Sequence, residues 1–475
     1  MAHLHEGKES LSEAAVEVAT GQRRLREQDH DTRGVRAKTS QSGFASAPVY
    51  IEEPLEHSGK TQHRKGGQGN SCEDHQEDQR HIALHTGNSF NTNLPTGLRK
   101  RFSTFKADSR SSSMEHPTHQ PAPLKEDKGV TGLANMRNTC YMNSALQALR
   151  HNTEISAFFL ENRHNQWVDR KPGSPKVELV KGYADLLKSL WSGSRPAYIR
   201  PQGFLQAMIP AAVAAGFDQF QVPLQHDSHE FLTFMLDQLH EGMAEEVNIE
   251  INRPPPLTER DKAIQQALEA WKRYFGKQYS PFTEMIYGLM RITMCCERCG
   301  AKSNTWETFN CIKLPIPVQS NTPVTLESML QEEFKEETIE GYACDKCSPE
   351  RTLAKRIMRI WRLPRMIVLS LKRFTPDARK IYTNFTFPQQ DPLVFRNYFS
   401  VDSPEPSQHQ PYECFATVDH HGSSGGGHYT AQAKSPLSEK WHLFDDETAS
   451  PISEPSFGVS TYIVFLKPSS KAAVA

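Results

Sequence analysis

GLANMRNTCYMNSALQALR, residues 132–150, places a cysteine, Cys140, directly before a segment whose apolar residues recur at helical spacing. Thr139 or Asn138 could cap a helix that runs from about residue 141 to residue 150. A cysteine at a helix N-terminus is a candidate nucleophile, because the backbone N–H groups there favour the thiolate. The alternative is a small packed thiol at the start of a core helix.

The partners that a catalytic cysteine requires lie far downstream, in VDHHGSSGGGHYTAQAK and WHLFDD. His428 follows three glycines and opens a β-like run, and Asp445 and Asp446 end the next one. The two runs could pair as antiparallel strands, which would bring Asp445 beside His428 and fix the imidazole tautomer. Taken singly, His428 could be a surface histidine and the aspartates a solvated turn. Together they favour a Cys–His–Asp centre.

Residues 129–468 have the composition of one folded domain of α+β class. Its first half carries helical patterns, as in HEFLTFMLDQLH, and its second half carries short β-like runs, as in MIVLSLKRF and TYIVFLK. Residues 1–128, rich in Ser, Gln, His, Gly and charge, are predicted to be a disordered arm, and residues 469–475 a disordered tail. The basic cluster at 98–101 is either a short nuclear signal or a solvated turn.

The bulk composition narrows the class of protein. The 475 residues carry a net charge of -1, which gives no reason to expect nucleic acid or an anionic membrane as a partner. The hydrophobic content is 37%, and no apolar run approaches the roughly 18 residues that span a bilayer. The N-terminus lacks the apolar core of a secretory signal. The nine cysteines are therefore expected in a reducing compartment, as metal ligands, catalytic groups or free thiols.

Two C-x-x-C pairs predict a metal site. Such a pair directs two thiolates at one ion, and two pairs complete a closed, structural Cys₄ zinc site without an open position for water. A redox pair or unligated thiols are the alternatives. Cys295 adjoins the first pair and is not expected to be a ligand. The predicted ligands are Cys296, Cys299, Cys344 and Cys347.

Several of these segments, in this order, resemble the motifs of the ubiquitin-specific proteases, which are papain-like deubiquitinases. GLANMRNTCYMNSALQAL resembles their cysteine box, and YECFATVDHHGSSGGGHYTAQAK followed by WHLFDDETASPI resembles their histidine box. LQHDSHEFLTFMLDQL and LKRF resemble intervening motifs. The resemblance covers about residues 129–467. It implies a papain-like fold with a helical thumb, a β-rich palm and zinc-ribbon fingers.

The resemblance also implies roles for individual residues. Cys140 becomes the nucleophile, His428 the general base, and Asp445 the residue that orients His428. Asn135 matches the side chain that stabilises the oxyanion, an effect worth roughly 3 kcal/mol in comparable enzymes. Asp446 is expected to support the same region.

Other matched positions imply contacts with the extended C-terminal tail of ubiquitin. Asp227 would face the arginines of that tail, and it could equally be the N-cap of the helix that follows. His420 and Tyr429 would line the channel, with Gly426 and Gly427 leaving room for the tail.

Arg137 departs from the family pattern, which usually has glycine at this place. If the position requires a positive φ, arginine there costs roughly 1 kcal/mol or more. We therefore expect this residue to affect the resting alignment of the Cys140 loop.

The predicted activity is thiol-dependent hydrolysis of the bond after the C-terminal glycine of ubiquitin on protein conjugates. The alternatives are a ubiquitin-binding scaffold with weak or no catalysis, and a protease for another modifier that ends in Gly-Gly. Expected partners are ubiquitin, ubiquitinated proteins and an adaptor that binds the N-terminal arm, in the cytoplasm or nucleus.

Overall fold

The computed structural model describes residues 81–84, 129–168, 173–192, 196–389, 391–423 and 425–469, all of which fall in one compact unit of the chain. These ranges leave out nearly all of the predicted N-terminal arm and the tail from residue 470. The prediction that the arm binds an adaptor therefore concerns residues outside the described ones. His81–Leu84, within the arm, form strand β1, which pairs in parallel with β4, Asn248–Ile251. Among the described residues, no helix has the length and apolarity needed to cross a membrane.

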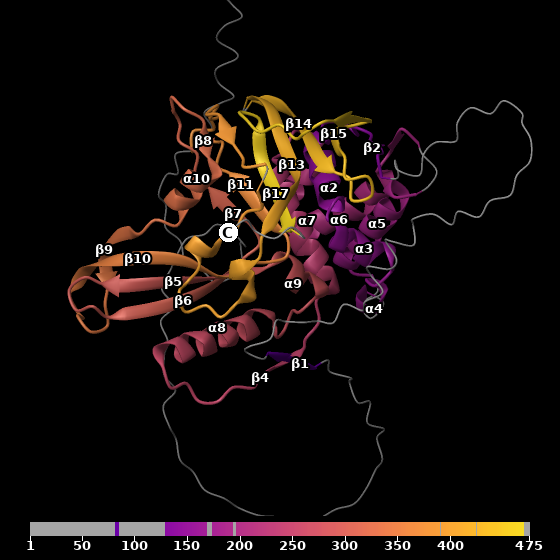
Figure 1. The fold of residues 1–475 in the computed structure, drawn as a ribbon. Helices are drawn as coiled ribbons and strands as arrows, with labels where there is room; N and C mark the ends of the chain where they lie inside the picture. The colour runs from indigo at the N-terminus through magenta and orange to yellow at the C-terminus, as the bar shows by residue number, and fades with distance from the viewer. Residues whose placement is uncertain are drawn as a thin grey trace, which may run out of the picture. The chain divides into compact units, whose positions relative to one another are not determined.

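The first half of the described domain is a helical lobe, as its 3.6-residue apolar spacing predicts (Figure 1). Its helices are α2 (Cys140–Arg150), α3 (Thr153–Leu160), α4 (Asn165–Val168), α5 (Pro175–Leu190), α6 (Gln202–Ala214), α7 (Ser228–Met243), α8 (Glu259–Phe275) and α9 (Pro281–Ile286). The short pair β2 (Gly132–Leu133) and β3 (Tyr198–Ile199) lies ahead of α2 and α6.

α2 is the central helix, and each of its eleven residues is buried. Its polar side chains are accommodated by hydrogen bonds to nearby backbone. Gln147 Nε2 donates to the carbonyl of Thr131 at 3.0 Å, and Arg150 Nη2 donates to that of Gly129 at 2.6 Å. The helix therefore has a fixed position between α7 and the large sheet, which determines where Cys140 lies.

A seven-stranded sheet forms the palm, in the order β16-β15-β14-β13-β17-β11-β7. Its strands are β16 (Thr448–Ile452), β15 (Trp441–Asp445), β14 (Gly426–Lys434), β13 (Tyr412–Ser423), β17 (Thr461–Pro468), β11 (Ile367–Leu371) and β7 (Ile312–Leu314). One hydrophobic core lies between this sheet and the helical lobe, and a second lies under β7, β11 and α10 (Leu326–Glu333).

A four-stranded antiparallel sheet, ordered β6-β5-β10-β9, extends away from the helical lobe and the palm (Figure 1). Its strands are β6 (Lys302–Phe309), β5 (Gly288–Cys296), β10 (Arg351–Arg362) and β9 (Glu337–Ala343). Both C-x-x-C pairs lie at strand ends of this sheet. A further short pair joins β8 (Val324–Thr325) to β12 (Phe385–Thr386). The structure therefore has the helical, β-rich and finger-like parts expected from the sequence.

Candidate active site and metal centre

Cys140 is the first residue of α2, one position earlier than predicted, and its exposed fraction is 3%. Thr139 is the N-cap, but its side chain makes no capping hydrogen bond. The backbone N–H groups of Cys140, Tyr141 and Tyr429 face the thiol and favour its ionised form. Burial outweighs them and raises the pKa of Cys140, with Asp446 adding to the rise. The resting group is therefore a thiol, which needs a base.

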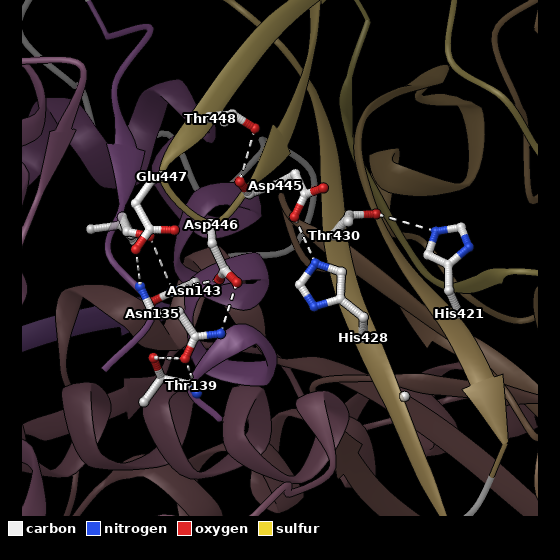
Figure 2. Close-up of polar contacts among 12 residues, drawn as sticks. Asn135, Thr139, Asn143, His421, His428, Thr430, Asp445, Asp446, Glu447 and Thr448 are labelled. Carbon is white, nitrogen blue, oxygen red and sulfur yellow. Dashed lines mark hydrogen bonds and ion pairs between the residues drawn. The ribbon is translucent and has the colours of Figure 1, made fainter. Parts of the chain in front are cut away.

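The predicted hairpin of β14 and β15 exists, and it brings His428 and Asp445 together. Nε2 of His428 lies 2.6 Å from Oδ1 of Asp445 (Figure 2). Because a carboxylate only accepts, Nε2 carries the proton and Nδ1 is the basic nitrogen. Both side chains are about half exposed, at 41% and 48%. The described residues include no hydrogen bond between Cys140 and His428, although Tyr429, next to His428, directs its N–H at the thiol.

Asn135 lies in a second cluster, beside the first (Figure 2). Its Nδ2 donates to Oδ2 of Asp446 at 2.8 Å, and its Oδ1 accepts from the backbone N–H of Thr139 at 3.1 Å. Asn143, one turn along α2, donates to Oδ1 of Asp446 at 2.8 Å, and Glu447 accepts from the backbone N–H of Asn135 at 2.9 Å. The two consecutive aspartates thus have different partners: Asp445 contacts His428, and Asp446 accepts from both asparagines.

Arg137 has φ +72° and is exposed, and Asn138 follows with φ +56°. The position therefore does require a left-handed backbone, as anticipated for a site where glycine is usual. Met136 N–H donates to Oγ1 of Thr139 at 2.8 Å, and Asn138 Nδ2 donates to the carbonyl of Pro223 at 2.9 Å. These bonds hold the loop in spite of the strain.

Asp227 is the N-cap of α7, which was one of its two predicted roles. Its Oδ1 accepts from the backbone N–H groups of His229 at 2.8 Å and Glu230 at 2.9 Å. Its Oδ2 accepts from the hydroxyl of Tyr462 at 2.6 Å. The carboxylate is thereby fixed between the helical lobe and β17.

His420 and Tyr429 lie side by side across β13 and β14, with ring centroids 4.5 Å apart. A Cβ on Gly427 would lie 2.2 Å from Nε2 of His420, whereas a Cβ on Gly426 would have no atom closer than 3.7 Å. Of these two glycines, Gly427 is therefore the one whose surroundings leave no space for a side chain. His420 is buried, and its pKa is lowered to about 4 by burial and by Lys380.

Gln225 was not given a role from the sequence, although it lies in the quoted segment two residues before Asp227. Its Nε2 donates to the carbonyl of Gly427 at 2.9 Å, and its Oε1 accepts from the N–H of Gly427 at 3.0 Å. A side-chain amide thus pairs with the edge of β14 as a strand residue would. Asn143 and Glu447 were also missed. The position of Asn143 three residues after Cys140, on the same helix face, was the available signal.

The four predicted metal ligands converge at the end of the finger sheet, with their sulfur atoms all within 4.8 Å of one another. Cys296 Sγ lies 3.9 Å from Cys347 Sγ, and Cys299 Sγ lies 3.5 Å from Cys344 Sγ. Four thiolates at about 2.3 Å from a tetrahedral ion would be about 3.8 Å apart, so the set fits a metal ion. Cys295 does not belong to this cluster.

The family model described as ubiquitin carboxyl-terminal hydrolase matches residues 131–470. Ubiquitin carboxyl-terminal hydrolase 2 of Bos taurus is 30% identical over 370 residues, which cover 75% of this chain and 57% of that protein. The Homo sapiens protein of that name is 31% identical, with 75% and 58% covered. The chain thus spans less than three fifths of these two relatives. The Gallus gallus protein is 31% identical, with 73% of this chain and 95% of that protein covered.

Among solved structures, the SAGA DUB module Ubp8/Sgf11/Sus1/Sgf73 bound to monoubiquitin contains a chain with a TM-score of 0.54 and 22% identity, covering 78% of this chain and 74% of that one. The same module bound to ubiquitin aldehyde gives a TM-score of 0.54 at 23% identity, with 74% and 72% covered. At these identities the likeness concerns the fold. With the family model and the relatives it leads to one assignment: the chain belongs to the ubiquitin carboxyl-terminal hydrolase family.

Proposed function

We propose that this protein is a thiol-dependent deubiquitinase, which hydrolyses the isopeptide or peptide bond after the C-terminal glycine of ubiquitin on protein conjugates. The observation that carries the proposal is Cys140 at the start of α2, against the strand that bears His428 held by Asp445. The names of the relatives agree with it.

In the proposed reaction, the thiol proton of Cys140 passes to Nδ1 of His428 as the sulfur attacks the glycine carbonyl carbon. The tetrahedral intermediate collapses to a thioester, and His428 gives its proton to the departing amine. Water, deprotonated by His428, then releases ubiquitin and restores the thiol. Because burial raises the pKa of Cys140, proton transfer coupled to attack suits this centre better than a preformed thiolate.

Asn135 is the proposed side-chain donor to the oxyanion. Its Nδ2 carries two hydrogens, and Asp446 accepts one of them. Among the described residues, no acceptor contacts the other hydrogen, which is free to donate. Asp446 would serve by fixing the amide plane, since it is itself held by Asn143.

Asp227, His420, Gly426, Gly427 and Tyr429 are the proposed contacts of the ubiquitin tail. The tail would enter between the N-terminus of α7 and the β13–β14 hairpin. In the structure, Gln225 connects these two elements through its hydrogen bonds to Gly427. A carboxylate at Asp227 suits a cationic tail, and Gly426 and Gly427, which have no side chains, would leave room for it.

We propose zinc as the ion of the Cys₄ cluster, because four thiolates at tetrahedral spacing are typical of structural zinc. Metal analysis of the purified chain should give about one zinc per chain. Cys299→Ser should lose most of it, whereas Cys295→Ser, the neighbouring control, should keep it. Absence of zinc with all four thiols freely titratable in the native protein would exclude the site.

A fluorogenic substrate attached to the C-terminus of ubiquitin tests the function. Wild-type protein should turn it over, and Cys140→Ala should not, while the variant still binds ubiquitin. Binding without turnover by the wild type would indicate a scaffold instead. Covalent labelling by vinyl-sulfone probes of ubiquitin and of other Gly-Gly-ended modifiers identifies the modifier.

The proposed compartment is the cytoplasm or nucleus, because a catalytic thiol and four thiolate ligands require reducing conditions. Ubiquitinated proteins would be the substrates. An adaptor bound to the N-terminal arm stays part of the proposal, to be tested by comparing captured partners with and without residues 1–128.

A further inference from the structure

The hairpin of β13 and β14 projects beyond the end of its neighbouring strand. The pairing runs on through His421 with His428 to Ser423 with Gly426. β17 begins at Thr461, which pairs with Asp419, and His420 N–H donates to the carbonyl of Ser460 at 2.8 Å. Past this point β17 no longer covers the β13 edge of the hairpin.

Two side chains from the loop after β11 take the place of the missing strand. In an antiparallel pair, alternate residues direct their backbone groups to the same edge, here those of His420 and Gly422. Lys380 Nζ donates to the carbonyl of His420 at 2.5 Å, and the Tyr382 hydroxyl donates to that of Gly422 at 3.1 Å. Each carbonyl that would otherwise be unpaired on this edge thus has a donor.

The opposite edge of the hairpin faces the reaction centre. Gly427 exchanges two hydrogen bonds with Gln225, and Tyr429, two residues on, directs its N–H at the thiol of Cys140. The hairpin is therefore a ribbon two strands wide, with Lys380 and Tyr382 on one edge and the catalytic sulfur on the other. His428 lies between the two contacts on the inner strand.

The loop that carries the two side chains is itself anchored. Arg373 is buried, and its guanidinium donates to the carbonyls of Ile381 at 3.1 Å, Thr383 at 2.8 Å and Thr461 at 2.6 Å. These bonds connect the loop to Thr461, the first residue of β17, so the backbone that carries Lys380 and Tyr382 has a fixed position. Burial and the nearby Arg373 lower the pKa of Lys380 to about 8, which leaves it mostly charged at pH 7.

We propose that Lys380 and Tyr382 are positioning residues of the active site, which act through the hairpin rather than on the substrate. By holding the outer edge, they keep the Tyr429 N–H on the Cys140 thiol and His428 in line for proton transfer. This inference rests on the proposed function for its effect on turnover, but not for its effect on the thiol.

The test measures two properties of the full-length protein. The first is kcat/KM on the fluorogenic ubiquitin substrate. The second is the pH dependence of iodoacetamide alkylation of Cys140, followed by mass spectrometry of its peptide. We expect Lys380→Met to lower kcat/KM about tenfold and Tyr382→Phe about fivefold, as for a charged and a neutral hydrogen bond. Both should move the alkylation midpoint to higher pH, because the Tyr429 N–H favours the thiolate.

Two further variants separate positioning from general damage. Lys380→Arg keeps a charged donor and should recover most of the activity. Arg379→Met changes the adjacent exposed side chain, whose guanidinium contacts Asp377. This variant should leave kcat/KM within twofold of wild type and the alkylation midpoint at the same pH.

An unchanged alkylation profile in both Lys380→Met and Tyr382→Phe would overturn the proposal, whatever happens to the thermal unfolding midpoint. Loss of activity that Arg379→Met shares would overturn it as well. If the wild type does not turn over the substrate but the alkylation midpoints still shift, the proposed function fails while the positioning role stands.

Discussion

Replacing Arg137 by glycine should stabilise the protein, although Arg137 lies three residues from the candidate nucleophile. A left-handed conformation costs a residue with a Cβ about 1–2 kcal/mol, and Arg137 has φ +72°. Glycine avoids that cost but loses about 0.5–1 kcal/mol through the greater freedom of the unfolded chain. The net gain, taken at the middle of these ranges, is about 0.75 kcal/mol. A domain of this size unfolds with an entropy of about 0.7 kcal/mol per K, so the expected rise in Tm is about 1 °C.

The measurement compares Arg137→Gly with Arg137→Ala by thermal and urea unfolding. Alanine removes the guanidinium and keeps the strain, so the difference between the two variants reports the backbone alone. The side chain is exposed, and the structure gives it no hydrogen bond or ion pair among the described residues. Arg137→Ala should therefore unfold with a midpoint close to that of the wild type.

Activity supplies the second half of this prediction. The bonds that hold Asn135 and Thr139 to each other do not involve residue 137, so kcat/KM of Arg137→Gly should stay within about threefold of wild type. A glycine variant no more stable than the alanine variant would refute the strain argument. A tenfold rise in kcat/KM would show instead that arginine misaligns the resting loop.

Three further outcomes follow from the geometry. Asp445→Asn should lower kcat/KM by at least about 100-fold with little change in Tm, because the amide can present the wrong tautomer to a histidine it still holds. Gly427→Ala should lose activity and about 1–3 kcal/mol of stability, because its Cβ would meet His420, whereas Gly426→Ala should be tolerated; equal effects would contradict the packing argument. Burial lowers the pKa of His240 to about 4, below its unfolded value near 6.5, so the unfolded state binds the proton first. The free energy of unfolding should therefore fall as the pH drops from 6.5 towards 4, by up to about 1.4 kcal/mol per pH unit. Urea unfolding of His240→Gln should show a flatter pH dependence.

The sequence was sufficient for the parts of the fold and site that depend on local pattern. Helical spacing predicted the first lobe, and the turn material before Trp441 predicted the hairpin that joins His428 to Asp445. The C-x-x-C spacing predicted a cluster that the fold brings together. In each case the chemistry of a short segment limits its possible partners.

The parts of the site that could not be predicted depend on where the strands next to the β13–β14 hairpin begin and end. Nothing in TYIVFLK indicates that β17 starts too late to cover the carbonyls of His420 and Gly422. The role of Lys380 follows from that register, and the role of Gln225 follows from the end of β15, whose pairing with β14 stops at Ala431. Each side chain pairs with strand backbone rather than with a recognisable side chain. Backbone partners leave no complementary residue in the sequence, which is why pattern analysis missed them.

The proposed reaction centre joins two substructures that are distant in sequence. Cys140 belongs to the helical lobe and His428 to the sheet, and the backbone N–H of Tyr429, beside His428, acts to lower the pKa of the Cys140 thiol. A shift of one residue in the β13–β14 pairing would turn His428 to the opposite face and replace that N–H. In the proposed reaction, the paired edges of the hairpin therefore matter together with the residues that react, because they would select which backbone donor and which histidine face the nucleophile.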